Sequence, residues 1–280
     1  MMFGAWGNPD HDDCVRIVHE ALDYGINFVD TADVYSAGES EIITGKALKG
    51  ARRDSVILAT KCHFPIDAGP FSNDRTPNTW GNSRRHIVKA CDDSLRRLGT
   101  DWIDLYQLHR PDPNVPIDES LSALNDLVHQ GKIRAFGCST FPAEHLVQAA
   151  WVADKKNFIP FSTEQPPYSI FVRWIERDLL PTCQRLGMGT LVWSPLNGGW
   201  LSGTYRSGAG QRTEGRAART PARYDLSDPA NAKKMELVEE LVVIADEIGV
   251  PLAHLAIAWV LHHPAVTSAI IGPRVMHHLT

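Results

Sequence analysis

Residues 101–139 read DWIDLYQLHRPDPNVPIDESLSALNDLVHQGKIRAFGCS and contain one complete strand–helix–strand pattern. Two short apolar runs, residues 102–108 and 133–138, flank a longer amphipathic segment, residues 118–130. Short runs rich in aliphatic and aromatic residues are typical of strands that are buried on both faces. The stretch therefore predicts two parallel strands joined by a helix.

The same alternation continues along most of the chain. Further strands are predicted at residues 27–30, 56–61, 161–165, 190–193 and 267–271. Further helices are predicted at residues 12–24, 39–48, 83–98, 143–153, 175–186, 232–248 and 252–262. In the helix at 232–248, the residues at helical spacing that we expect to face the core are Leu237, Leu241, Ile244, Ala245 and Ile248.

Strand–helix alternation on this scale predicts a parallel sheet with covered faces, which is either a closed barrel or a doubly wound sheet. A doubly wound dinucleotide-binding fold would carry Gly-x-Gly-x-x-Gly after its first strand, and this sequence has no such motif. We therefore expect an α/β fold, a (β/α)8 TIM barrel formed as one domain by residues 1–280. Two long segments rich in Gly, Pro and polar residues, 64–82 and 203–229, are expected to be functional loops.

The composition is that of an ordinary globular protein. Hydrophobic residues make up 43% of the 280 residues, which excludes a disordered chain. The 28 basic and 33 acidic residues give a net charge of −5, which argues against nucleic acid or a membrane surface as the partner. No transmembrane run or signal peptide is visible, and the 5 dispersed cysteines fit reduced thiols. A cytoplasmic location is therefore expected, while the sequence gives no indication of the oligomeric state.

Polar residues follow three consecutive predicted strands. Asp30 ends one strand and Tyr35 lies in the loop beyond it, Lys61 ends the next strand, and His109 follows the third. In a (β/α)8 barrel such positions meet at the rim where catalysis takes place. A cation such as Lys61, held by Asp30, can lower the pKa of a phenol, and His109 can orient a substrate oxygen. The four residues suit protonation of a developing alkoxide, which carbonyl reduction by hydride requires.

Each of these residues also has a purely structural interpretation. A lysine at a strand end often belongs to a structural ion pair, and a single tyrosine or histidine often only packs. The convergence of all four at one rim favours catalysis. A metal site is not expected, because there is no His-x-x-x-His motif and no carboxylate cluster at ligand spacing.

The sequence resembles the aldo-keto reductase family along essentially its whole length, most closely a bacterial branch similar to potassium-channel β subunits. The resemblance is carried by GINFVDTADVY (25–35), LATK (58–61), DWIDLYQLH (101–109), GCSTF (137–141), Gln165, WSPL (193–196) and IIGPR (270–274). It implies that Tyr35 is the general acid, that Lys61 tunes it, that Asp30 pairs with Lys61, and that His109 orients the carbonyl of a small aldehyde or ketone.

The resemblance also implies an NADP(H) site. Ser139 and Gln165 would bind the carboxamide, Trp193 would stack on the nicotinamide ring, and an arginine would lie near the 2′-phosphate. The complete set of expected cofactor residues is Ser139, Thr140, Gln165, Trp193, Ser194, Pro195, Leu196, Gly198, Gly272 and Arg274. Thr140 replaces an Asn found in many relatives, and the segment after Arg274 departs from the family pattern, so NAD(H) is the alternative cofactor.

The chain is expected to differ from the family at both ends, and two alternative functions remain open from the sequence. Compared with the family, the chain is expected to lack the N-terminal hairpin and first strand and the C-terminal helix and tail. A nucleotide-binding regulatory subunit is the second functional hypothesis, and His109 argues against it because the resembling channel subunits carry Asn there. An aldolase that uses Lys61 as a Schiff base is the third hypothesis.

Overall fold

The computed structural model describes residues 1–67, 76, 78–207 and 220–279, and the chain divides into two compact units. The first unit comprises Met1–Gln165, Thr182–Gly189 and Gly272–Thr280, and the second comprises Pro166–Pro181 and Thr190–Ile271.

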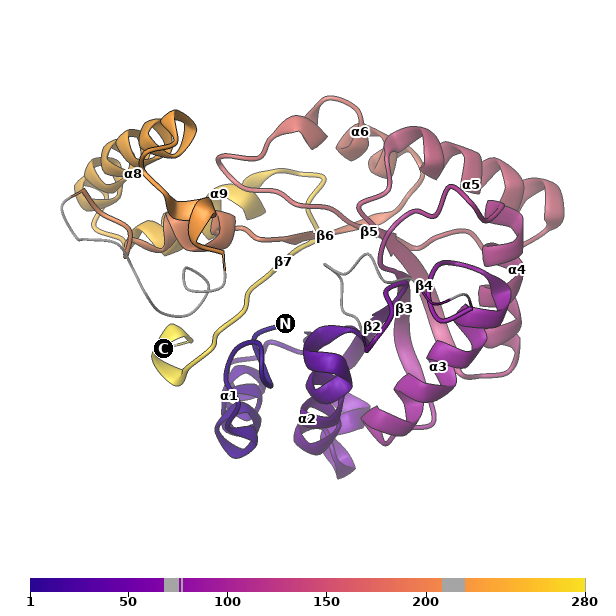
Figure 1. The fold of residues 1–280 in the computed structure, drawn as a ribbon. Coiled ribbons are helices and arrows are strands. Elements are labelled where there is room, and N and C mark those ends of the chain that lie inside the picture. Colours follow the sequence, from indigo (N-terminus) through magenta and orange to yellow (C-terminus); the bar gives the residue numbers. More distant parts are fainter. Residues whose placement is uncertain (68–75, 77, 208–219, 280) are drawn as a thin grey trace. The chain divides into compact units, whose positions relative to one another are not determined.

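Five strands form a parallel sheet in the first unit, in the order in which they occur along the chain (Figure 1). They are β1 (Phe28–Asp30), β2 (Ile57–Cys62), β3 (Ile103–Leu108), β4 (Ile133–Ser139) and β5 (Thr163–Gln165). Most of their residues from β2 onward are buried, as the apolar runs predicted. Because the strands are parallel, their carboxyl ends lie along one edge of the sheet.

A helix lies before β1, and further helices follow β1 to β4, so that consecutive helices pack against one another. They are α1 (His11–Asp23), α2 (Glu39–Ala47), α3 (Arg84–Leu98), α4 (Ile117–His129) and α5 (Ala143–Lys156). The start of α3 is fixed by Ser83, whose side chain accepts a hydrogen bond from the backbone N–H of His86, and its end by Gly99 at φ 64°. The strand–helix alternation predicted for this part of the chain is confirmed.

In the second unit, residues of β6 (Gly189–Trp193) pair in parallel with β7 (Ser268–Ile270). Two helices, α8 (Pro229–Glu247) and α9 (Leu252–His262), precede β7. The unit has its own apolar core, which consists of Trp200, Tyr224, Met235, Val238, Val242, Ala245 and Leu252. Tyr224 stacks on Trp200 with ring centroids 5.6 Å apart.

Short 3-10 helices complete the secondary structure of the described residues. They are η1 (Tyr35–Gly38), η2 (Gly50–Ser55), η3 (Trp174–Glu176), η4 (Asn197–Ser202), η5 (Pro221–Tyr224) and η6 (Met276–His278). The described part of the predicted loop at 203–229 therefore includes a helical turn, η5. Residues 68–75 and 77 of the first predicted loop and 208–219 of the second lie outside the described residues.

Two details of the predicted helices were wrong. The single helix expected at 175–186 is η3 followed by α6 (Leu179–Arg185), because Pro181 fits only in the first turn of a helix. In α8 the buried face runs through Met235, Val238, Val242 and Ala245. Of the residues expected there, Ile244 and Ile248 are instead 48% and 57% exposed.

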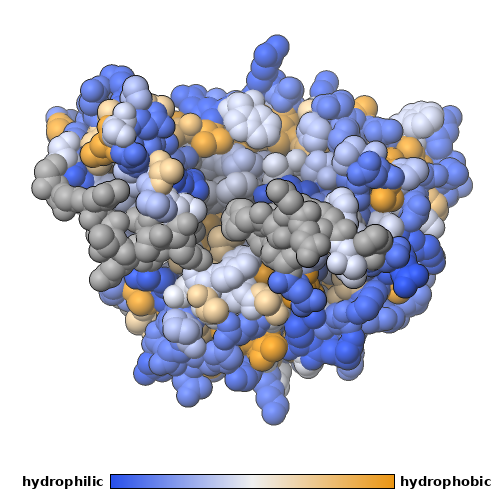
Figure 2. Space-filling view, viewed as in Figure 1, coloured by the Kyte–Doolittle hydropathy of each residue, from blue (hydrophilic) through white to orange (hydrophobic). Residues whose placement is uncertain are grey.

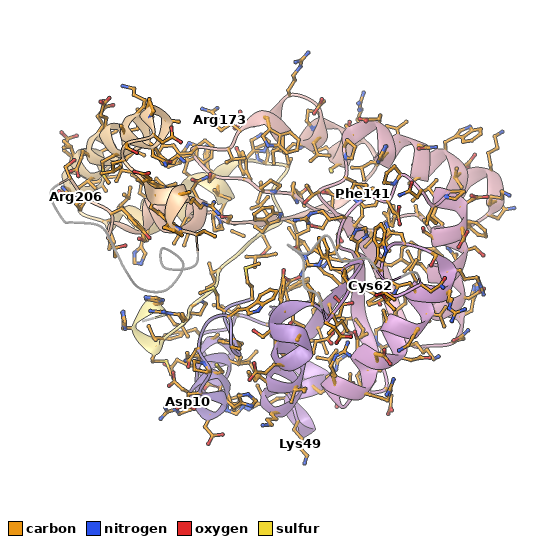
Figure 3. The ribbon with its side chains drawn as sticks, viewed as in Figure 1. Asp10, Lys49, Cys62, Phe141, Arg173 and Arg206 are labelled. Carbon is orange, nitrogen blue, oxygen red and sulfur yellow. The ribbon has the colours of Figure 1, made fainter. Side chains whose placement is uncertain are left out.

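The view in Figure 2 shows mostly hydrophilic residues, with apolar residues in small scattered groups. In Figure 3, Lys49 points away from the ribbon just after α2, whereas Cys62, the last residue of β2, is buried. No single helix of the described residues is long and apolar enough to cross a membrane. The pair α8 and α9 passes that test of length and composition only together, and it is bent by 91°.

Candidate active site

The carboxyl ends of the five strands in the first unit carry the polar residues predicted for the site. Asp30 is the last residue of β1, and Ser139 and Gln165 are the last residues of β4 and β5. Lys61 precedes the last residue of β2, and His109 follows β3, with its backbone N–H donating to Cys62 O at 2.9 Å. Parallel pairing brings these side chains to one edge of the sheet, as predicted.

Lys61 is completely buried and its charge is fully engaged. Its Nζ donates to Oδ2 of Asp30 at 2.6 Å and to the carbonyl oxygen of Thr31 at 2.7 Å. Burial lowers the pKa of Lys61, but the Asp30 carboxylate and the phenol of Tyr35 outweigh burial, so the pKa lies above its ordinary value. A Schiff-base lysine needs a lowered pKa to be a neutral nucleophile, so this geometry does not support the aldolase hypothesis.

The second oxygen of Asp30 is held by amide groups from two other strands. Oδ1 accepts a hydrogen bond from Nε2 of Gln165 at 2.9 Å and a longer one from Nε2 of Gln107 at 3.4 Å. The two glutamines are themselves 3.4 Å apart, from Nε2 of Gln165 to Oε1 of Gln107. Asp30 therefore fixes the orientation of the predicted carboxamide-binding residue as well as that of Lys61.

Tyr35 begins η1, a tight turn stabilised by neighbouring chain segments. Its backbone N–H donates to Ala32 O at 3.2 Å, and the following Ser36 has φ 51°. The hydroxyl of Ser36 donates to Phe3 O at 3.0 Å and accepts from the backbone N–H of Trp6 at 3.1 Å. These contacts fix the backbone of the turn that carries the partly buried Tyr35 side chain.

The phenol of Tyr35 lies beside Lys61, whose Nζ is 5.3 Å from the ring centroid. Burial raises the pKa of Tyr35, and the positive charge of Lys61 lowers it by less, so the pKa lies above its ordinary value. Lys61 therefore acts in the direction predicted from the sequence, but it does not set the net result. Tyr35 keeps its proton at neutral pH.

His109 is 6% exposed and packs edge-on against Tyr35, with ring centroids 5.6 Å apart. Burial and then the nearby Lys61 and Arg110 cations hold the pKa of His109 well below its ordinary value. The imidazole is therefore neutral at pH 7 and carries one N–H donor. Among the described residues, its Nδ1 has no hydrogen-bond partner.

The ends of β4 and β5 are joined by hydrogen bonds. The Ser139 hydroxyl donates to Gln165 O at 2.8 Å, and the Thr140 backbone N–H donates to the same oxygen at 3.2 Å. Within the described residues, Oε1 of Gln165 receives no hydrogen bond, so it remains an acceptor for an amide group. The donor and acceptor set therefore fits a carboxamide. Thr140 has φ 61°, a left-handed conformation that suits Asn or Gly better than a β-branched residue.

The remaining predicted cofactor residues lie after β5 in the sequence. Trp193 ends β6 in the second unit, and the Oγ of Ser194 accepts the backbone N–H of Gly198 at 3.0 Å across Pro195 and Leu196. Gly272 and Arg274 lie beyond β7 and belong to the first unit, where Nδ2 of Asn8 donates to Arg274 O at 2.9 Å. Their roles in cofactor binding stay predictions.

Three residues of this site were not predicted from the sequence. Gln107 is a buried polar residue inside an apolar run, which is a usable signal. Arg110 follows His109 directly, and its guanidinium lies 5.8 Å from the ring centroid of Phe64. Glu164 precedes Gln165 and is completely buried, and burial raises its pKa to about 7.

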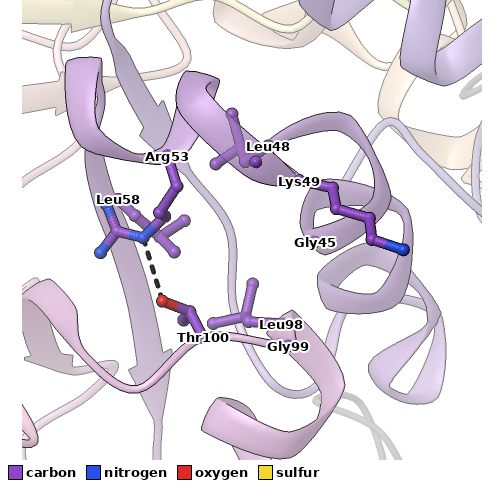
Figure 4. A pocket seen from close by; sticks show the side chains of 9 residues that line it. Gly45, Leu48, Lys49, Arg53, Leu58, Leu98, Gly99 and Thr100 are labelled. Carbon is purple, nitrogen blue, oxygen red and sulfur yellow. Dashed lines mark hydrogen bonds between the residues drawn. The ribbon is translucent and has the colours of Figure 1, made fainter.

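A pocket distinct from this site is shown in Figure 4. Its lining residues are Gly45, Leu48, Lys49, Gly50, Arg53, Leu58, Leu98, Gly99 and Thr100. Arg53 donates to Oγ1 of Thr100 at 3.2 Å and forms an ion pair with Asp104 at 2.8 Å. The charge of this arginine is therefore already satisfied, and the pocket contains none of the predicted site residues.

Sequence comparisons with known proteins identify the family of this chain. The sequence profile of the aldo/keto reductase family matches residues 1–280. An "Uncharacterized oxidoreductase YrpG" of Bacillus subtilis is 40% identical over 287 residues, which cover 100% of this chain and 83% of that protein. A "Probable voltage-gated potassium channel subunit beta" of Arabidopsis thaliana is 36% identical, over 97% of this chain and 82% of that protein. A "Versiconal hemiacetal acetate reductase" of Aspergillus parasiticus is 35% identical, over 93% of this chain and 80% of that protein.

The match confirms both the resemblance and the predicted fold class, and it supports a general oxidoreductase function. The chain belongs to the aldo/keto reductase family and has its (β/α)8 TIM-barrel class of fold.

Proposed function

We propose that the protein is an NADP(H)-dependent oxidoreductase that reduces an aldehyde or ketone carbonyl to an alcohol, with Tyr35 as the general acid. The observation that carries this proposal is the buried 2.6 Å ion pair between Lys61 and Asp30 beside the Tyr35 phenol. The reductase name of one relative supports the reaction class. A cytoplasmic location and a small carbonyl substrate are part of the same proposal.

Each side chain has one task in this reaction. Tyr35 holds a proton at neutral pH and donates it from Oη to the substrate oxygen as negative charge develops there. Lys61 remains cationic and stabilises the phenolate left behind, while Asp30 keeps the ammonium in place. Neutral His109 donates an N–H hydrogen bond that orients the carbonyl.

The cofactor supplies a hydride to the carbonyl carbon when it is bound. Ser139 and Gln165 would hold its carboxamide, since an acceptor remains on the Gln165 side chain. The guanidinium of Arg274 would recognise a 2′-phosphate, which favours NADP(H) over NAD(H). Trp193 would stack on the nicotinamide ring.

Tyr35→Phe tests the proposal, and Tyr24→Phe is the matched control because Tyr24 is 62% exposed. Purified variants are titrated with NADPH and with NADH by tryptophan fluorescence, and then assayed with a panel of aldehydes. We expect Tyr35→Phe to bind cofactor like the parent and to lose most turnover, while Tyr24→Phe retains it. Reduction by Tyr35→Phe at the parent rate would contradict the assignment of the acid.

The second candidate is a regulatory subunit with little turnover, which the channel-subunit name of one relative suggests. His109 favours the enzyme, since a neutral imidazole can orient a substrate carbonyl. Tight cofactor binding without reduction of any aldehyde or ketone would favour the regulatory role.

A further inference from the structure

Aromatic rings form a continuous row beside the predicted acid. We call this set the aromatic row, and its members in spatial order are Trp6, Tyr35, His109, Phe64, His63 and Trp80. The successive ring centroids are 6.4, 5.6, 5.1, 4.9 and 5.9 Å apart. The rings cross at steep angles, with interplanar values between 52° and 89°. Trp6, Tyr35 and Trp80 are partly exposed, so these three rings of the row offer apolar surface to a flat aromatic substrate.

Besides Lys61 next to Tyr35, a second cation lies against the aromatic row. The guanidinium carbon of Arg110 is 5.8 Å from the Phe64 ring centroid, and Arg110 interacts electrostatically with the Tyr35 phenol. Its Nη1 donates to the backbone oxygen of His109 at 2.6 Å, which fixes the side chain next to the site. The cation is thus positioned by its own backbone and by an aromatic ring.

Among the described residues Arg110 has no carboxylate partner, in contrast to two other arginines of the first unit. Arg53 pairs with Asp104 at 2.8 Å, and Arg97 pairs with Glu41 at 2.6 Å. Arg110 forms no ion pair with any carboxylate in the part of the chain that the structure describes. A guanidinium has five N–H donors, so most of the donors of Arg110 remain available.

The nearby Glu164 does not take the place of such a partner. Its Oε1 accepts the backbone N–H of Phe141 at 3.1 Å, and its Oε2 accepts the Sγ–H of Cys138 at 3.0 Å. Burial raises the pKa of Glu164 to about 7, so a large part of this group is protonated near neutral pH. The charge of Arg110 is therefore not neutralised from within the site.

We propose that Arg110 is a specificity-determining residue that binds a carboxylate carried by an aromatic carbonyl substrate whose ring packs on the aromatic row. This inference rests on the proposed reductase function and names its substrate class. A planar guanidinium binds a carboxylate through two parallel hydrogen bonds, and partial burial strengthens that contact. The carboxylate takes no part in the reaction, so it contributes to binding and orientation.

The test compares 4-formylbenzoate with its neutral methyl ester, which has the same ring and the same aldehyde. The variants are Arg110→Met, Arg110→Lys and the matched control Arg85→Met, since Arg85 is exposed on α3. For Arg110→Met we expect kcat/KM for the acid to fall about 10- to 100-fold, the loss typical of a charge-assisted hydrogen-bonded pair. The value for the ester, which has no charge to lose a partner, should fall by much less. Arg110→Lys should recover part of the loss, and Arg85→Met should match the parent.

The inference is overturned if Arg110→Met affects both aldehydes equally or affects neither. It is also overturned if the parent shows no preference for the acid over the ester. Reduction of the ester without such a preference leaves the proposed function standing and removes only this inference. Failure to reduce any aldehyde with either cofactor removes the proposed function. In that case calorimetric titration with benzoate and with benzamide tests the anion site independently of turnover. If Arg110 binds a carboxylate, the parent binds benzoate more tightly than benzamide, and Arg110→Met loses this difference.

Discussion

Glu164 should make the stability of the fold depend on pH in the direction opposite to that of an ordinary paired carboxylate. The side chain is completely buried, and burial raises its pKa from 4.5 to about 7. Because the folded pKa is above the unfolded pKa, the folded state binds more protons between these two values. The free energy of unfolding therefore falls as pH rises from 4.5 to about 7, and the loss is complete above that range.

The size of the effect follows from the same values. The interval between 4.5 and about 7, at about 1.4 kcal/mol for each pH unit, corresponds to about 3 kcal/mol. Two buried histidines, His86 and His109, have lowered pKa values and act in the opposite direction below pH 6.5. The informative quantity is thus the difference between the parent and Glu164→Gln, since the histidine contribution cancels.

Urea unfolding followed by tryptophan fluorescence at pH 5, 6, 7 and 8 measures this difference. We expect Glu164→Gln to gain about 2–3 kcal/mol relative to the parent between pH 5 and pH 8. The control Glu247→Gln, an exposed residue at the end of α8, should change little with pH. A difference between Glu164→Gln and the parent that stays constant over this range would refute the reasoning.

Two further changes follow from the site geometry. Lys61→Met leaves Asp30 as an uncompensated buried charge, so it should lower the free energy of unfolding by about 3 kcal/mol. The double variant with Asp30→Asn should recover part of this loss. If Lys61→Met alone is as stable as the parent in urea, the reasoning is wrong. Thr140→Asn should raise stability by about 1 kcal/mol, because Asn tolerates the left-handed φ of 61° better than a β-branched residue; an unchanged or lowered melting temperature would show that the position carries no strain.

The polar residues at the strand ends could be predicted from the sequence, because each of them ends or follows a short apolar run. Asp30, Lys61 and His109 all stand at such a boundary, and parallel strands bring such boundaries to one edge. The amides around Asp30 could not be predicted in this way. Gln165 is 135 residues away from Asp30 along the chain, and only the tertiary fold determines which oxygen it reaches.

The errors in the helices have local physical causes. In α8 every position from Leu241 to Ile244 is apolar, so helical spacing alone does not select one face. The structure buries Val242 and leaves Val243 57% exposed. At 175–186, Pro181 lacks a backbone N–H and clashes with the preceding turn, so α6 begins at Leu179 and keeps the proline within its first turn. Pro181 could therefore have indicated the start of α6 from the sequence.

The protonation states of the site are set by burial more than by neighbouring charges. Burial favours the neutral form of every titratable group, and it leaves Tyr35 protonated and His109 neutral. Lys61 departs from this rule because Asp30 lies 2.6 Å away and stabilises the ammonium. The ammonium is thereby committed to an ion pair, and a neutral imidazole is a very weak acid. Tyr35 is then the proton donor that suits the reaction. It keeps its proton at neutral pH, and the phenolate that forms when the proton leaves would be stabilised by the fixed Lys61 cation beside it.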